Sequence, residues 1–289
     1  MTAGHAFAML IGVLGTSTIH LSKGVMKHGL VRLRDHTRRS SRTARTIYAL
    51  GVVMNFTNPL WVIVANRFAP TVYYTSMYGI GLIALLLYSH RRLAETVSRN
   101  QVIGIGVIVI GTLLIGALEL GGGAPSLYNA SRALVLTIAV VWLIAAPLAA
   151  LASLRASIVT REVIFGVAAG GLAALEAVVK GVSQAGAESS TFLPQTPANW
   201  ALFVVSFAGA AGAFGMIQWA FLRSCRASMM GAIYTTTYVA LPLIVSPLVT
   251  GSRVPSVGSL FGIAIIAGGA LLAVSATRVT SATPVASSG

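Results

Sequence analysis

Ionisable side chains are scarce in the apolar parts of this sequence, so each one there is a candidate for chemistry. Glu176 is the only carboxylate well inside an apolar segment, and Lys180 follows it by four residues. Residues four apart on a helix face one another, so the two can form an ion pair. One interpretation is a carboxylate that binds a substrate or carries a proton, tuned by its lysine. The other is a structural pair whose lysine reaches the membrane surface.

Amides and tyrosines in other apolar segments are further candidates to line a substrate path: Asn55, Asn58, Gln218, Tyr74, Tyr78, Tyr234 and Tyr238. The amides can coordinate a cation, bind a solute or hold helices together. The tyrosines form two pairs with four-residue spacing, and the members of each pair share a helix face. Such aromatic walls suit an organic cation, or they pack the helices.

Lys23 and His20 lie near the end of the first apolar segment. We interpret Lys23 as an anchor at the membrane interface, where its ammonium group reaches water. His20 can titrate near neutral pH, but a single His at a helix end is more simply a structural residue.

The sequence contains no constellation typical of an enzyme. It has no phosphate-binding Gly-Lys-Ser/Thr loop, no His-Glu-x-x-His run and no paired carboxylates. Cys225 is the only cysteine, which excludes an internal disulfide and a cysteine metal cluster. We therefore expect a protein that is not an enzyme and needs no cofactor, and we assign no metal ligands.

The composition predicts an all-α integral membrane protein. Of 289 residues, 56% are hydrophobic and 9% are charged, whereas soluble domains have about 25% charged residues. A helix needs roughly 20 apolar residues to span a bilayer, and lipid leaves backbone groups no water to bind. Nine segments fit: 3–22, 47–66, 69–89, 101–118, 133–153, 163–182, 198–222, 227–249 and 257–276.

The basic residues predict the orientation of these segments. Of the 20 Lys and Arg residues, 16 lie in 23–46, 90–100, 154–162, 223–226 and the tail, on one side of the membrane. Basic residues concentrate in cytoplasmic loops, so we expect the N-terminus outside, the C-terminus in the cytoplasm and an odd number of spans in the plasma or inner membrane. The net charge of +14, including the basic loop 31–46, then reflects topology and contact with membrane lipids rather than nucleic acid.

Three short matches at a common offset of 157 residues indicate an internal repeat. Lys23-Gly24-Val25 falls on Lys180-Gly181-Val182, Ala69-Pro70-Thr71 on Arg226-Ala227-Ser228, and Gly111 and Leu114 on Gly268 and Leu271. Spans 1–4 (residues 1–124) would correspond to spans 6–9 (161–277). The connector 125–160 holds span five, and 278–289 would be a disordered cytoplasmic tail. Five spans separate the copies, so the second is inverted, as in many secondary transporters.

Several stretches resemble the NIPA-like magnesium transporters of the drug/metabolite transporter superfamily: Gly15-Thr16-Ser17 with Lys23-Gly24, Asn55-Phe56, Ala65-Asn66-Arg67-Phe68-Ala69-Pro70-Thr71, Ala220-Phe221-Leu222 and Gly231-Ala232-Ile233-Tyr234. The resemblance implies that family's inverted-repeat fold and transport of magnesium. This chain has Gly51-Val52-Val53-Met54 where the family usually has a Glu before the Asn-Phe. Magnesium prefers carboxylate ligands, so the missing Glu weakens the hypothesis that this chain transports magnesium.

We therefore expect a nine-helix secondary transporter that moves a small solute or a cation such as magnesium by alternating access. The alternatives are an exporter of small organic cations, drugs or metabolites, and a membrane scaffold or subunit that transports nothing. The expected partners are the substrate and membrane lipids, and a homodimer stays open.

Overall fold

The computed structural model describes residues 3–34, 38–66, 68, 74–122, 127–185, 193–251 and 256–280. Within these ranges the chain forms helices and connecting turns, without a β-strand. The helices, in chain order, are α1 (Ala3–Arg34), α2 (Arg38–Phe56), α3 (Asn58–Asn66), α5 (Tyr78–Arg92), α6 (Arg99–Gly122), η1 (Leu127–Asn129), α7 (Arg132–Ala152), η2 (Ser153–Arg155), α8 (Ile158–Gln184), α9 (Pro197–Leu222), α10 (Ala227–Thr250) and α11 (Val257–Thr280).

Seven of the described helices are long and apolar enough to cross a membrane: α1, α6, α7, α8, α9, α10 and α11. Large apolar side chains on the outer surface agree with this, since Val53, Ile110, Leu148, Val204 and Leu271 are each more than half exposed. Such a surface suits lipid rather than water. The prediction of an all-α integral membrane protein is confirmed at this level.

The first two predicted spans have different boundaries in the structure. α1 continues past residue 22 to Arg34 and α2 begins at Arg38, so most of the predicted loop 31–46 is helical. The predicted span 47–66 is divided at Thr57 into the end of α2 and the short helix α3. Pro59 has no N–H to donate to the carbonyl of Asn55, and its ring would clash with that carbonyl in a continuous helix, which explains the break.

The C-terminal helix α11 also extends beyond its prediction, to Thr280. The predicted disordered tail 278–289 thus begins within a helix, and residues 281–289 lie outside the described residues.

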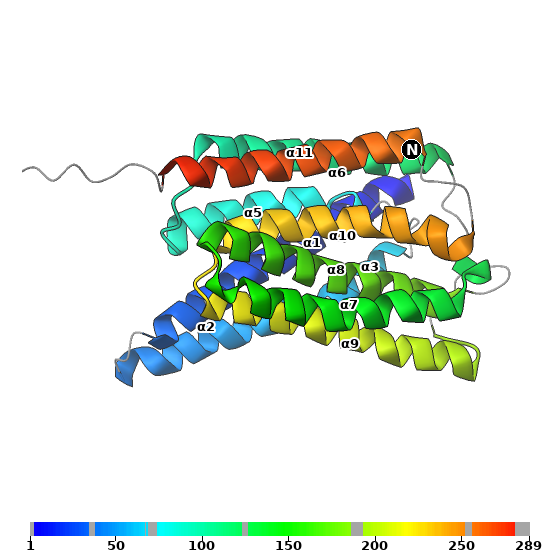
Figure 1. Ribbon diagram of the computed structural model, residues 1–289, viewed down its shortest axis with the longest axis horizontal. Helices are drawn as coiled ribbons and strands as arrows, with labels where there is room; N and C mark the ends of the chain where they lie inside the picture. Colours follow the sequence, from blue (N-terminus) through cyan, green and yellow to red (C-terminus); the bar gives the residue numbers. More distant parts are fainter. Residues whose placement is uncertain are drawn as a thin grey trace, which may run out of the picture.

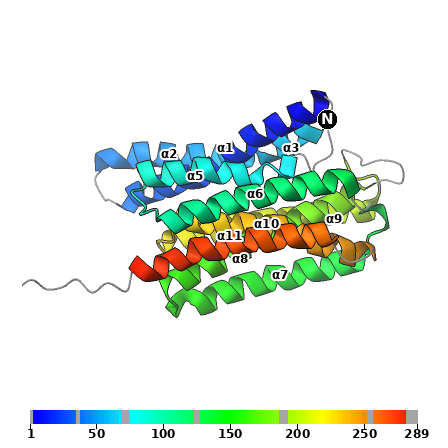
Figure 2. The same cartoon turned by 90° about the horizontal axis from the view of Figure 1, so that it is seen from above.

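The two termini of the described chain lie at opposite ends of the helix bundle (Figure 1). α1, α5, α7, α9 and α11 finish at one end, where α2, α6, α8 and α10 begin (Figure 1). We name this the basic end, because its turns contain Arg34, Arg92, Arg155, Arg223 and Arg226. Seen from above, α1, α2, α3 and α5 lie along one side of the bundle, and α7 and α8 lie on the other (Figure 2).

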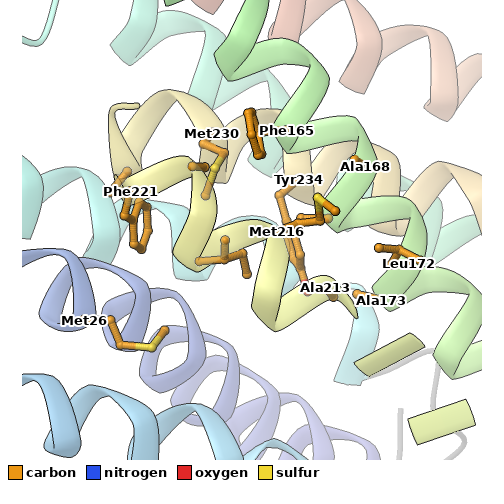
Figure 3. Close-up of a cluster of buried hydrophobic side chains, with 14 of the residues drawn as sticks. Met26, Phe165, Ala168, Leu172, Ala173, Ala213, Met216, Phe221, Met230 and Tyr234 are labelled. Atoms are coloured by element: carbon orange, nitrogen blue, oxygen red, sulfur yellow. The ribbon is translucent and has the colours of Figure 1, made fainter. Parts of the chain in front are cut away.

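Small residues allow close helix contacts throughout the bundle. α6 runs along α11, where a Cβ added to Gly104 would lie 2.5 Å from the carbonyl oxygen of Gly269. The largest buried cluster joins α1, α8, α9 and α10 and includes Met26, Phe165 and Met230 (Figure 3). Inside a membrane, such packing stabilises helix association mainly through van der Waals contact.

Candidate functional site

Buried polar side chains line up along the contact between α1 and α10. On α1 they are Thr16, His20, Lys23 and Lys27, whose spacing of three or four residues places them on one face. On α10 the polar side chains that meet this face or extend it along the helix are Ser228, Tyr234, Thr235 and Tyr238. We name these eight residues the polar column. Polar side chains inside a membrane protein are costly and often mark a substrate path.

Lys23 is buried within the protein, so the expectation that its ammonium group reaches water as an interface anchor is wrong. Its side chain is 1% exposed, and its Nζ lies 3.5 Å from the centroid of the Tyr234 ring. Nζ has no hydrogen-bond partner among the described residues. α1 continues for another eleven residues to Arg34, so the charge does not mark the end of the helix.

His20 is also fully buried, which corrects its predicted place at the interface. Its Nδ1 lies 2.9 Å from the carbonyl oxygen of Thr16, and its Nε2 lies 2.8 Å from Oγ1 of Thr235. A carbonyl can only accept, so Nδ1 carries the proton, and in a neutral ring Nε2 accepts from the Thr235 hydroxyl. His20 therefore joins α1 to α10.

The two predicted tyrosine pairs meet in one aromatic group. The rings of Tyr78 and Tyr238 stack with centroids 4.4 Å apart, and Tyr234 and Tyr238 are stacked at 6.0 Å. Tyr74 meets Tyr78 edge-on at 6.5 Å, and its hydroxyl donates to Oδ1 of Asn58 at 3.1 Å. The structure thus brings together side chains from α3, α5 and α10 and the short segment before α5.

A cavity of about 210 Å³ adjoins this aromatic group, with Tyr238 in its wall. At roughly 30 Å³ for each water molecule, it has room for about seven waters or one small solute. Its lining includes the hydroxyl-bearing residues Thr112 and Ser246, together with Pro242. Pro242 cannot donate to the carbonyl of Tyr238, so the α10 backbone is interrupted beside the cavity.

Glu95 closes the polar column at the basic end. Its Oε1 accepts from Nζ of Lys27 at 2.6 Å and from the backbone nitrogen of Ala227 at 2.8 Å. Its Oε2 accepts from the hydroxyl of Ser228 at 2.6 Å. Burial alone would raise the pKa of Glu95, but the charge of Lys27 and these hydrogen bonds hold that pKa below its usual value.

Glu162 at the start of α8 binds the residue that precedes α10. Its Oε1 accepts from the backbone nitrogen of Arg226 at 2.7 Å, and its Oε2 lies 2.5 Å from Nη2 of Arg226. The hydrogen bond to Glu162 raises the pKa of Arg226 despite partial burial. We name Glu95, Glu162, Lys27 and Arg226 the basic-end cap.

Glu95 and Glu162 were not among the predicted site residues. One signal was present: α10 begins after Arg226, which provides no side-chain cap for the free N–H groups of the first turn. The chain has only six acidic residues, and Glu95 and Glu162 lie in predicted loops on the same side of the membrane as Arg226. Their carboxylates were therefore available to accept hydrogen bonds from the start of α10.

The remaining predicted site residues lie at other helix contacts. Glu176 and Lys180 form the expected ion pair within α8, and Lys180 lies 5.3 Å from the centroid of Phe207 on α9. Gln218 accepts from the Tyr48 hydroxyl at 3.2 Å, and Asn55 makes a long contact of 3.5 Å with Ser22. The contacts of Gln218 and Asn55 connect α2 to α9 and α1 to α2, outside the polar column. Glu176 lies close enough to Tyr234 and Tyr238 for its charge to act on them.

No group of three His, Cys, Asp or Glu side chains converges to hold a metal ion in the described part of the chain. The three carboxylates whose side chains are described, those of Glu95, Glu162 and Glu176, each pair with Lys or Arg.

Comparison of the chain with protein-family models, with curated proteins and with solved structures finds no match.

Proposed function

We propose that this protein is a secondary transporter that moves a small solute across the membrane by alternating access. The observation that carries the proposal is the cavity beside Tyr238 at one end of the polar column, while ion pairs of Glu95 and Glu162 join helices at the column's other, basic end. A binding space at one end of a polar path, with ion pairs joining the helices at the other end, is what one state of a transporter requires. Opening the cap while closing the cavity's other end would complete the cycle.

Nine crossings are part of this proposal, with the N-terminus outside and the basic end in the cytoplasm. Seven crossings are the long apolar helices. The remaining two would be α2 together with α3, and the segment that ends in α5. The opposite positions of the two termini (Figure 1) support an odd number, and the arginines of the basic end support its cytoplasmic location.

Helix contacts support an inverted repeat of spans 1–4 and 6–9. In the first half α1 packs on α2 and α5, and α5 packs on α6. In the second half α8 packs on α9 and α10, and α10 packs on α11. The halves meet through α5 with α10 and α6 with α11, which are equivalent pairs under the 157-residue offset. The cavity lies between the halves, where transporters of this type bind their substrates.

A small organic solute fits this site better than magnesium does. Magnesium binding in proteins usually includes one or two carboxylates, and the described carboxylates are engaged by Lys or Arg. The cavity wall instead offers tyrosine and hydroxyl-bearing side chains.

Reconstitution of the full chain into liposomes tests the proposal by uptake of a panel of small organic acids, amines, neutral solutes and magnesium. Ser246→Phe should fill the cavity and abolish uptake. Leu248→Phe, on the same helix but 60% exposed, is the matched control and should retain uptake. The proposal is wrong if no solute enters faster than into empty liposomes, or if both variants transport like the native chain.

A further inference from the structure

The three lysines of this chain differ in what neutralises them. Lys27 pairs with Glu95, and Lys180 pairs with Glu176. Lys23 is the least exposed of the three, and its Nζ has no hydrogen-bond partner in the part of the chain that the structure describes. Its one described charge-stabilising contact is the ring face of Tyr234.

A ring face does not satisfy a buried ammonium group. The group has three N–H donors, all of which bind acceptors in water, and the ring offers one weak, diffuse attraction. A buried charge without a counter-charge is strongly unfavourable. Lys23 thus provides N–H donors and, when protonated, a positive charge that the described neighbouring residues leave unused; a bound carboxylate would stabilise the protonated form.

The neighbouring groups of the polar column cannot serve as that counter-charge. His20, one turn earlier on α1, already uses both ring nitrogens. One turn later, Lys27 adds a second positive charge and occupies Glu95. Glu162 is held by Arg226. Glu176, whose charge lies within electrostatic range of Tyr234, is held by Lys180.

Comparison of the two halves at the 157-residue offset shows that the first half lacks the carboxylate that pairs with the lysine in the second half. It places Lys23 on Lys180 and Ile19 on Glu176. In the second half the lysine has a carboxylate four residues before it, whereas in the first half that position holds a buried isoleucine.

We propose that Lys23 binds the carboxylate group of the transported solute, a small organic monocarboxylate. The inference rests on the proposed function and names the substrate class. One lysine matches one negative charge, whereas phosphate sites usually combine several cations or helix N-termini. Tyr238 lines the cavity and stacks on Tyr234, the ring that Lys23 contacts, so displacement of these rings would bring the solute from the cavity to the ammonium group.

Binding to the purified full chain in lipid nanodiscs tests this without a transport assay. The probes are lactate and benzoate, with lactamide and benzamide as neutral partners of the same shape. The native chain should bind the acids at least tenfold more tightly than the amides. Lys23→Met should remove this preference and Lys23→Arg should retain much of it. Arg132→Met, at a basic residue that donates to Asn199 away from the polar column, should leave it unchanged.

Ile19→Glu provides a second test that does not depend on how Lys23→Met folds. The introduced carboxylate lies four residues before Lys23, as Glu176 does before Lys180, and should displace bound acids. We expect a higher unfolding temperature and loss of acid binding. Equal binding of acids and amides by the native chain, or acid binding unchanged by both Lys23→Met and Ile19→Glu, would overturn the proposal.

The two proposals fail in different ways. If the native chain binds acids through Lys23 but transports none, the transporter proposal fails and the carboxylate site stands. If it transports neutral or cationic solutes independently of Lys23, the transporter proposal stands and the carboxylate site is wrong.

Discussion

Oε1 of Glu95 lies 2.6 Å from Nζ of Lys27, and the same oxygen accepts from the backbone of Ala227. One carboxylate therefore connects α1 to the first turn of α10. Both side chains are almost fully buried, so this contact is protected from the screening that weakens surface ion pairs. The contact can hold the basic end closed and must break if that end opens.

Cys225 lies beside this contact and reports on it. The thiol is fully buried, and burial, together with the charge of Glu162, raises its pKa to about 11. We expect very slow reaction with a maleimide in the native chain, because the thiolate is both rare and covered. Glu95→Gln leaves Lys27 without a carboxylate, and it should speed the labelling at least fivefold and cost about 3 kcal/mol of stability.

The labelling rate is measured by a gel shift with polyethylene-glycol maleimide. Glu176→Gln is the control, since its pair lies on α8 away from the cap, and it should label at the native rate. Equal rates in native and Glu95→Gln protein would show that Glu95 does not keep the basic end closed.

Stability should depend on pH through Glu95. A carboxyl whose pKa is lower in the folded chain than in the unfolded chain stabilises the fold above its ordinary pKa, and this contribution is lost as pH falls through the folded value. The unfolding temperature should therefore decline below about pH 4.3, the ordinary value for Glu. Thermal unfolding in detergent should show a smaller decline for Glu95→Gln. Identical declines would mean that the Glu95 pair adds nothing to stability.

Two glycines on α6 provide a matched test of the α6–α11 contact. Gly104→Ala places a methyl group 2.5 Å from the Gly269 carbonyl, whereas a methyl group on Gly106 meets nothing within 4 Å. We expect Gly104→Ala to lose about 1–3 kcal/mol through overpacking, and Gly106→Ala to be neutral or slightly stabilising. Thermal unfolding of the two variants measures the difference, and equal stability would contradict this close packing.

The proposed nine crossings predict that the two termini lie on opposite sides of the membrane. Reporter enzymes that are active on only one side, fused to each end, would measure this. We expect a cytoplasmic signal at the C-terminus alone. The same signal at both ends would exclude an odd number of crossings and the inverted repeat with it.

Much of the helical layout follows from the sequence, because long apolar runs have few other stable forms in lipid. The predicted segments 133–153, 198–222 and 227–249 agree with α7, α9 and α10 to within one residue at each end. Prediction failed where charge is buried. We placed the end of the first span before Lys23 because lysine side chains are usually exposed, but Lys23 is buried and α1 continues to Arg34.

The partners of the site residues could not be predicted from local patterns. Lys27 binds a residue 68 positions away, and His20 binds one 215 positions away. Four-residue spacing identified the two tyrosine pairs and the Glu176–Lys180 pair. That Tyr78 stacks on Tyr238 follows only from the packing of α5 on α10.

Pro242 divides α10 into two parts with different attachments. The first turn is fixed by hydrogen bonds from Ala227 and Ser228 to Glu95, and Arg226 just before it is bound by Glu162. Beyond the proline, α10 is held by apolar packing of Val245 and Val249, and the backbone nitrogen of Ser131 donates to the carbonyl oxygen of Val249. A bend at Pro242 would change the cavity while leaving the cap intact. If the cap and the part of α10 beside the cavity move separately in this way, the path need not be open to both sides of the membrane at the same time.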